Sequence, residues 1–188
     1  MNLAIPERLI SIPEYLEGEP RSDVRHEYVA GQVYAMAGAG EKHNIIALNI
    51  ASMLRSVARG TPCRVFISDM KVRVEQNDAF YYPDVMVTCD PQDTESLHKR
   101  LPCLIVEVLS PATEAIDRRE KLIAYRTLPS LRYYLLVSQE KRQVEWYTRD
   151  TDNRWLIAVT EDNGSLEILC NDLKVNFTLD DIYEDVRL

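Results

Sequence analysis

The alternation of apolar and polar residues along this chain predicts strands interrupted by two long helices. Residues 42–59 place apolar side chains at three- and four-residue spacing, which is typical of an amphipathic helix, and Gly60 stands where such a helix ends. Residues 113–128 predict a second helix, with Thr113 as its N-terminal cap and Pro129 just beyond its end.

The other segments have the short apolar runs and bounding turn residues of β-strands. Residues 25–36 predict a hairpin that turns at Ala30-Gly31. Short helical turns are expected at residues 13–19 and 179–183. Further strands are expected at residues 64–68, 71–75, 81–88, 101–109, 131–138, 143–148, 155–160 and 166–169. This order of elements predicts a mixed sheet flanked by helices, an α/β or α+β domain with a β-rich C-terminal part.

Two carboxylates fall inside segments that should be buried. Asp84 follows Pro83 at the start of an apolar run, and Glu107 has three apolar residues before it and two after it. A buried, ionised carboxylate without a partner costs several kcal/mol, so two of them on neighbouring strands indicate a shared divalent metal ion. The alternatives are structural: Asp84 can accept hydrogen bonds from nearby backbone N–H groups, and Glu107 can pair with Lys121 or an arginine.

Lys121 lies on the predicted helix that follows the Glu107 strand, and such a helix should pack back across the sheet. Beside two carboxylates, a lysine can orient a water molecule or stabilise charge on a phosphate. The alternative for Lys121 is a weak surface ion pair with Asp117, four residues earlier. Glu27 is a further acidic candidate, or else an exposed charge of the hairpin. His43 is interpreted as structural.

Composition adds limits to this picture. The 188 residues (21.7 kDa, 46% hydrophobic, 28% charged) predict one domain, residues 1–188. No apolar stretch approaches the roughly 20 residues that cross a bilayer, and the N-terminus lacks a secretion signal, so a cytoplasmic protein is expected. The four cysteines form no C-x-x-C pair, which argues against a zinc site; Cys89 and Cys103 are interpreted as buried thiols in a reducing compartment.

The net charge of −8 argues against a protein that coats nucleic acid through a broad positive field. It leaves room for a local basic groove around an acidic site. Nine lysines and arginines are available to line one: Arg55, Arg59, Arg64, Lys71, Arg73, Lys99, Arg100, Arg118 and Arg119.

The placement of Pro83-Asp84 on one strand, with Glu107 on an apolar strand some twenty residues later, resembles the PD-(D/E)XK nuclease superfamily. The wider pattern resembles one of its branches, the Uma-type family of restriction endonucleases. The matching stretches are residues 25–31, 68–72, 82–85 and 104–113, then Asp117, Lys121, Tyr125 and residues 133–137.

The resemblance implies a restriction-endonuclease-like central sheet and a metal-dependent phosphodiester hydrolase that cleaves DNA as an endonuclease, acting as a homodimer. It implies that Asp84 and Glu107 hold Mg²⁺ or Mn²⁺ together with the backbone carbonyl of Val108, and that Glu27 contributes further acidity.

The superfamily's lysine, two residues after the Glu, is replaced here by Leu109, so the resemblance implies that Lys121 supplies the amine. This departure and the acidic net charge support an alternative, a degenerate nuclease fold that acts as a non-catalytic nucleic-acid-binding or assembly module.

Overall fold

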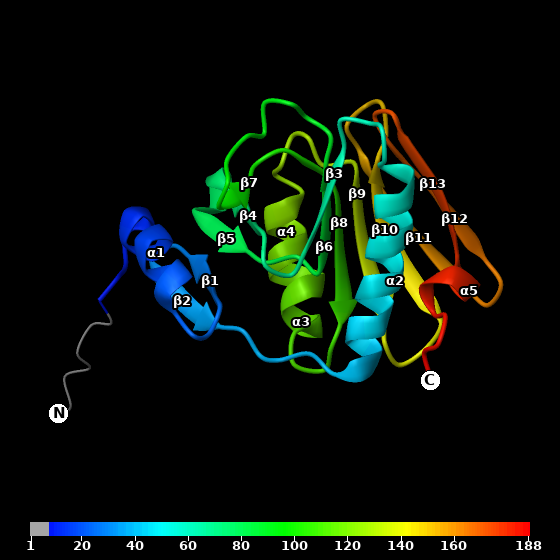
Figure 1. Ribbon diagram of the computed structural model, residues 1–188, viewed down its shortest axis with the longest axis horizontal. Helices are drawn as coiled ribbons and strands as arrows, with labels where there is room; N and C mark the ends of the chain where they lie inside the picture. The colour runs from blue at the N-terminus through cyan, green and yellow to red at the C-terminus, as the bar shows by residue number, and fades with distance from the viewer. Residues whose placement is uncertain (1–7) are drawn as a thin grey trace.

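The chain folds around a six-stranded mixed sheet that runs through the middle of the molecule (Figure 1). The computed structural model describes residues 8–188; the first part of the N-terminal stretch, where the sequence predicts no secretion signal, lies outside the described residues. The strand order is β11-β10-β9-β8-β6-β3, with β8 and β9 parallel and the other pairs antiparallel. Its strands are β3 (Arg64–Ile67), β6 (Val85–Thr88), β8 (Pro102–Leu109), β9 (Tyr133–Ser138), β10 (Gln143–Arg149) and β11 (Trp155–Glu161).

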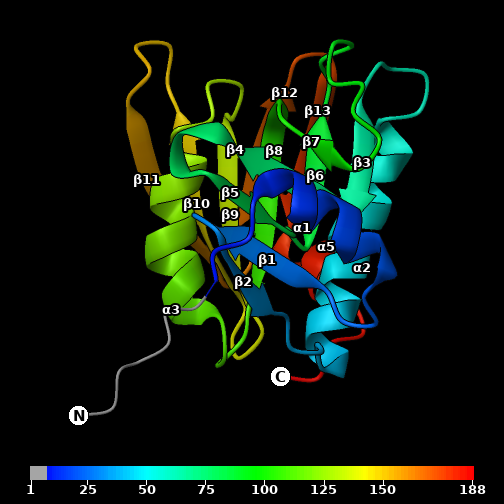
Figure 2. The ribbon, with the colours of Figure 1, turned by 90° about the vertical axis from the view of Figure 1, so that its left-hand side faces the viewer.

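Two smaller sheets pack against the large one. A five-stranded sheet has the order β2-β1-β5-β4-β7, and β12 and β13 form an antiparallel pair. Figure 2 looks onto the five-stranded sheet and shows α2 and α3 on opposite sides of it. The strands of these sheets are β1 (His26–Val29), β2 (Gln32–Ala35), β4 (Lys71–Val74), β5 (Ala79–Tyr81), β7 (His98–Lys99), β12 (Ser165–Cys170) and β13 (Leu173–Thr178). The predicted hairpin and the mixed-sheet fold class are confirmed.

The helices are short except for one, α2. In residues 8–188, no helix is long and apolar enough to cross a membrane. The predicted long helix and the helical turns near both ends of the chain are confirmed. The helical segments are α1 (Ile12–Gly18), η1 (Glu19–Arg21), α2 (Glu41–Val57), η2 (Glu75–Asn77), α3 (Glu114–Ile116), η3 (Asp117–Lys121), α4 (Leu122–Tyr125) and α5 (Leu179–Ile182).

The two faces of strand β8 enter different surroundings, although every residue of the strand is buried. Leu104 and Val106 join the core that α2, β12, β13 and α5 build on one side of the large sheet. Ile105 and Leu109 join the core that α4, β4 and β5 build on the other side. Because side chains alternate along a strand, Glu107 lies on this second side, which confirms that it is buried within a strand covered on both faces.

The strand that the sequence predicts around Pro83 is in fact two strands in different sheets. The chain leaves the five-stranded sheet at the end of β5 and enters the large sheet at the start of β6. Pro83 has no N–H to donate to a strand partner. The N–H groups on either side of it bond carboxylates: Tyr82 N donates to Glu27 Oε1 (3.2 Å), and Asp84 N donates to Glu107 Oε2 (3.4 Å). The crossing between the sheets therefore fixes two acidic side chains.

The second predicted helix contains a π-helical turn, η3, between α3 and α4. Such turns occur often at functional sites. Thr113 precedes α3 as predicted, but its side chain makes no capping hydrogen bond to the helix and lies 3.0 Å from Ser110 Oγ instead. Asp117 and Lys121 are the first and last residues of the π turn, and both are buried.

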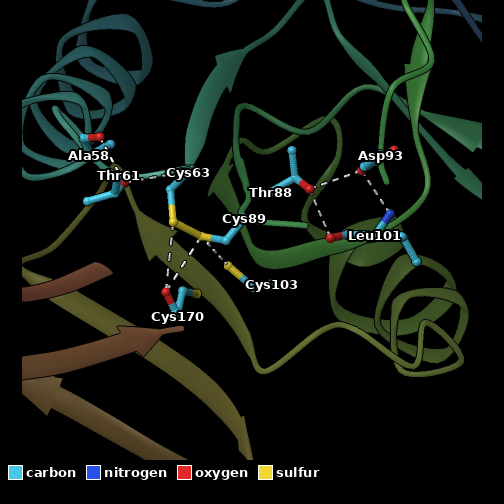
Figure 3. Close-up of a disulfide and its surroundings, with 9 residues drawn as sticks. All are labelled: Ala58, Thr61, Cys63, Thr88, Cys89, Asp93, Leu101, Cys103 and Cys170. Atoms are coloured by element: carbon cyan, nitrogen blue, oxygen red, sulfur yellow. Dashed lines mark hydrogen bonds between the residues drawn. A yellow bond between two sulfur atoms is a disulfide. The ribbon is translucent and has the colours of Figure 1, made fainter. Parts of the chain in front are cut away.

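The four cysteines gather in the core beside α2 (Figure 3). Cys63 and Cys89 form a disulfide, and Cys103 Sγ lies 3.8 Å from Cys89 Sγ. The interpretation of Cys89 as a free thiol is therefore wrong. Since Arg64 pairs with Thr88 across β3 and β6, the residues just outside this pair, Cys63 and Cys89, face each other. Cys103 is a free, buried thiol as expected.

Candidate active site

Asp84 and Glu107 meet at the end of the β6–β8 pair. The two strands are antiparallel neighbours, and their pairing ends where Val85 faces Val106. Beyond that point the Asp84 carboxylate, rather than a strand backbone, accepts the hydrogen bond from β8: Val108 N donates to Asp84 Oδ2 at 2.7 Å. The structure therefore brings together the three residues for which the sequence predicted metal ligation.

Lys121 lies at the centre of three carboxylates. Its Nζ is 2.9 Å from Glu27 Oε1, 3.2 Å from Asp117 Oδ1 and 3.3 Å from Glu107 Oε1. The Lys121 side chain is 6% exposed, and that of Asp117 is 2% exposed. The i,i+4 pair with Asp117 thus exists but is buried, so it is not the surface pair that the sequence offered as an alternative. Glu107 does pair with Lys121, as the structural alternative required.

Glu27 reaches this cluster from the other sheet. It lies on β1, which pairs with β5, and its carboxylate also accepts the N–H of Tyr82. Its side chain is 15% exposed, so Glu27 is not the exposed hairpin charge that the alternative described. The cluster therefore joins the five-stranded sheet to the large sheet.

Two buried tyrosine hydroxyls form hydrogen bonds with acidic residues of the cluster. Tyr125 OH donates to Glu107 Oε1 at 2.9 Å, and Tyr134 OH donates to the backbone carbonyl of Asp117 at 3.0 Å. Both rings are completely buried and lie edge to face, with centroids 5.2 Å apart. Tyr125 comes from the helix after β8, and its one-turn spacing from Lys121 puts both side chains on the side of the helix that faces Glu107.

His43, which the sequence analysis interprets as structural, lines the same cavity. Its Nε2 lies 3.1 Å from Asp84 Oδ2. Burial lowers the pKa of His43, but hydrogen bonds to the Asp84 carboxylate and the Val108 carbonyl outweigh burial and raise it above the ordinary value. The Val108 carbonyl therefore faces the same side as Asp84.

Burial dominates the electrostatics of the cluster. It raises the pKa of Glu107 well above its ordinary value, although the Lys121 ammonium opposes it, and it raises the pKa of Asp117 in the same way. For Lys121, burial lowers the pKa, but Glu107, Glu27 and Asp117 together raise it well above the usual range. Lys121 is thus firmly protonated.

The cluster lines a cavity of about 560 Å³ between the N-terminus of α2 and the loop after β8. Within the cluster, four carboxyl groups (Glu27, Asp84, Glu107 and Asp117) share one ammonium and one imidazole, and all of them but Glu27 line the cavity. This excess of negative charge and the oxygen-rich donor set fit a hard divalent cation. No three His, Cys, Asp or Glu side chains within residues 8–188 are arranged to hold a metal ion by themselves. Asp84 and Glu107 would thus supply the side-chain ligands, with the backbone carbonyl of Val108 as a third oxygen donor and water completing the shell.

The predicted basic groove does not surround this cavity. The basic side chains along its wall are those of Arg25, His43 and Lys121, and none of the nine predicted residues is among them. Arg55, Arg59 and Arg64 instead line a separate cavity near the other end of α2. The sequence could not show this, because their distance from the acidic residues depends on the direction in which α2 runs.

Comparison with known proteins finds a matching family model and several similar proteins. A family model described as "Putative restriction endonuclease" (Uma2) matches residues 12–181. Two Synechocystis sp. proteins named as uncharacterized are similar: slr1290, 38% identical over 93% of this chain and 91% of its own length, and sll1609, 31% identical over 85% and 93%.

A solved structure, described as a putative nuclease belonging to DUF820 from Anabaena variabilis, has a TM-score of 0.73 at 16% identity. The alignment covers 93% of this chain and 97% of the solved one. At this low identity the likeness shows a shared fold.

Proposed function

Because the chain belongs to the Uma2 restriction endonuclease family, we propose that it is a metal-dependent phosphodiester hydrolase that cleaves DNA. One observation carries the proposal: Asp84 and Glu107 lie side by side in a cluster where four carboxyl groups share only the Lys121 ammonium and the His43 imidazole. A purely structural site would balance these charges, because uncompensated buried carboxylates are costly.

The donors that would hold Mg²⁺ or Mn²⁺ are the carboxylates of Asp84 and Glu107 and the carbonyl of Val108. When bound, such an ion polarises a phosphate oxygen and makes water a stronger nucleophile at neutral pH. Among residues 8–188, Lys121 is the only cation within ion-pair distance of Glu27 and Asp117. Their negative charge therefore adds to the attraction of the cluster for a divalent ion.

The side chains around these donors hold them in place. Tyr125 and Lys121 both contact Glu107 Oε1, which leaves Oε2 directed toward Asp84. His43 orients the Asp84 carboxylate from α2. Lys121 also lines the cavity, where its positive charge would face a phosphate.

The start of α2 adds a second element suited to a phosphate. Gly38 and Gly40 line the cavity, and no side chain caps the first turn of the helix. Uncapped N–H groups at a helix N-terminus favour anions. A phosphodiester entering this cavity would thus meet donors from α2 on one side and the acidic pair on the other.

Cleavage of supercoiled plasmid at low salt tests the proposal. Wild-type protein is incubated with Mg²⁺ or Mn²⁺, with and without a chelator, beside Glu107→Gln and the exposed control Glu167→Gln. We expect metal-dependent nicking in wild type and in the control, and none in Glu107→Gln. Equal nicking by all three proteins would show that the activity does not come from this site.

One observation favours the second candidate, a non-catalytic nucleic-acid-binding module. All three carboxylate neighbours of Lys121 lie within 3.3 Å of its ammonium, so its positive charge is already shared among three anionic side chains. Plasmid binding without cleavage, at any metal concentration, would identify this function. The homodimer and the cytoplasmic location stay predictions; sedimentation equilibrium would test the first.

A further inference from the structure

A second cavity, of about 450 Å³, opens where α2 ends and β3 begins, and its charged lining is entirely basic. Arg55, Arg59 and Arg64 line it together with the apolar edge of Phe66. Within residues 8–188 no carboxylate lies within ion-pair distance of these three guanidinium groups. In a chain of net charge −8, three unpaired arginines around one hollow indicate a site for an anion.

The neighbourhood of the cavity strengthens its positive field. Lys99 Nζ lies 5.3 Å from the Phe66 ring centroid, and the Arg64 guanidinium lies 5.9 Å from it. Burial and the nearby Arg64 lower the pKa of Lys99, while Asp93 and Glu95 oppose them. Arg64 also donates to the Asp93 backbone carbonyl at 2.6 Å, which fixes its position at the rim.

The two cavities lie at opposite ends of the same pair of elements. His43 at the start of α2 lines the acidic cavity, and Arg55 near its end lines the basic one. β3 returns from Arg64 to the turn at Ser68, which again lines the acidic cavity. In the described part of the chain, β3 is an edge strand of the large sheet, so no further strand pairs with its outer edge.

The separation can be estimated from helix geometry. Twelve residues separate His43 from Arg55, which corresponds to about 18 Å along α2 at roughly 1.5 Å per residue. Nucleic acid in a duplex rises about 3.4 Å per base pair, so the basic cavity lies about five base pairs from the acidic one. A phosphate chain extending from the acidic cavity along β3 would reach the arginines within one half-turn of a duplex.

We propose that Arg55, Arg59 and Arg64 form an anchor for the sugar-phosphate backbone of the nucleic-acid substrate, about five base pairs from the phosphate in the acidic cavity. This inference rests on the proposed function. Guanidinium groups suit the role because they stay charged and bind phosphate oxygens in a bidentate manner. Such an anchor lets an acidic protein bind a polyanion, because the positive charges that attract the phosphates lie in a cavity separate from the carboxylates.

The test measures binding of a fluorescein-labelled 20-base-pair duplex by anisotropy over a series of salt concentrations, in chelator so that no cleavage occurs. The variants are R55A/R59A/R64A, R55K/R59K/R64K and the matched control R8A/R21A/R154A, whose arginines are 71–83% exposed and paired elsewhere. We expect the alanine triple variant to lower the slope of log affinity against log salt by about 2–3, at about 0.9 per phosphate contact. The lysine variant should keep most of the slope, and the control all of it.

Equal slopes for the alanine variant and the control would overturn the anchor. Loss of the slope without any cleavage by wild type would leave the anchor standing and refute the hydrolase. Cleavage by wild type with an unchanged slope would do the reverse.

Discussion

The two faces of strand β8 are buried to the same degree but contribute to the molecule in different ways. One face carries only apolar side chains, such as Leu104 and Val106, which pack against α2 and the β12–β13 pair. The other carries Glu107, whose carboxylate depends on Lys121 and Tyr125. Apolar burial stabilises the first face, whereas the second bears the desolvation cost of charges. The fold and its candidate chemistry are thus separated across a single strand.

Lys121→Met should have the largest effect on stability. It leaves three buried or half-buried carboxylates without their shared cation, so we expect a loss of about 3–5 kcal/mol in the free energy of unfolding, measured by urea denaturation. The matched control is Lys174→Met, which removes an exposed lysine paired with Glu167 and should cost less than about 1 kcal/mol. Similar losses in both variants would mean that the buried carboxylates on the polar face do not depend on the Lys121 ammonium.

Leu104→Ala tests the apolar face of the same strand. The side chain is fully buried, so its truncation should cost about 3 kcal/mol through lost burial and an unfilled cavity. Because Leu104 points away from the carboxylates, the cleavage rate per folded molecule should stay at the wild-type value. A large drop in that rate would show that the two faces are not independent.

Tyr125→Phe and Tyr134→Phe sharpen the comparison within the polar face. The first removes a hydrogen bond to a carboxylate and should cost about 2 kcal/mol; the second removes one to a backbone carbonyl and should cost about 1 kcal/mol. Urea denaturation measures both. The reverse order would indicate that Glu107 does not need the Tyr125 hydroxyl, as expected if Glu107 were uncharged.

The smallest expected effect on stability comes from His98. Its Nδ1 is buried and has no hydrogen-bond partner in the described part of the chain. Burial lowers the pKa of His98, so the folded protein favours the neutral ring, while the unfolded chain takes up a proton near pH 6.5. Stability should therefore fall as the pH drops below about 6.5. His98→Phe should lose less stability than wild type between pH 7 and pH 5; identical pH profiles would contradict this.

The sequence predicted the parts of the site that stand out from their surroundings. Asp84 and Glu107 are carboxylates in apolar runs, and Lys121 lies on the helix that must cross back over Glu107. His43 could not be found in this way, because a histidine at a helix start breaks no pattern. Its role depends on how the loop from β2 places α2 beside β6.

The same reasoning explains the errors in the fold. Eight consecutive positions around Pro83 look like one strand, because the change of sheet is decided by hydrogen bonds to Glu27 and Glu107 rather than by local pattern. The Cys63–Cys89 disulfide depends on the pairing of β3 with β6, which separates the two residues by 26 positions in sequence. Strand β7, only two residues long, carries too little pattern to be predicted.

The most direct test of the central claim is the thermal unfolding midpoint with and without Mg²⁺, in wild type, Glu107→Gln and Glu167→Gln. A bound ion stabilises the folded state by about 2.7 kcal/mol at a hundred times its dissociation constant. We expect Mg²⁺ to raise the midpoint of wild type and of Glu167→Gln but not of Glu107→Gln. In chelator, Glu107→Gln should be at least as stable as wild type, because the excess negative charge is relieved. Two results would contradict a metal site on the polar face of β8: a wild-type midpoint that does not change when Mg²⁺ is added, or an equal rise of the midpoint in Glu107→Gln.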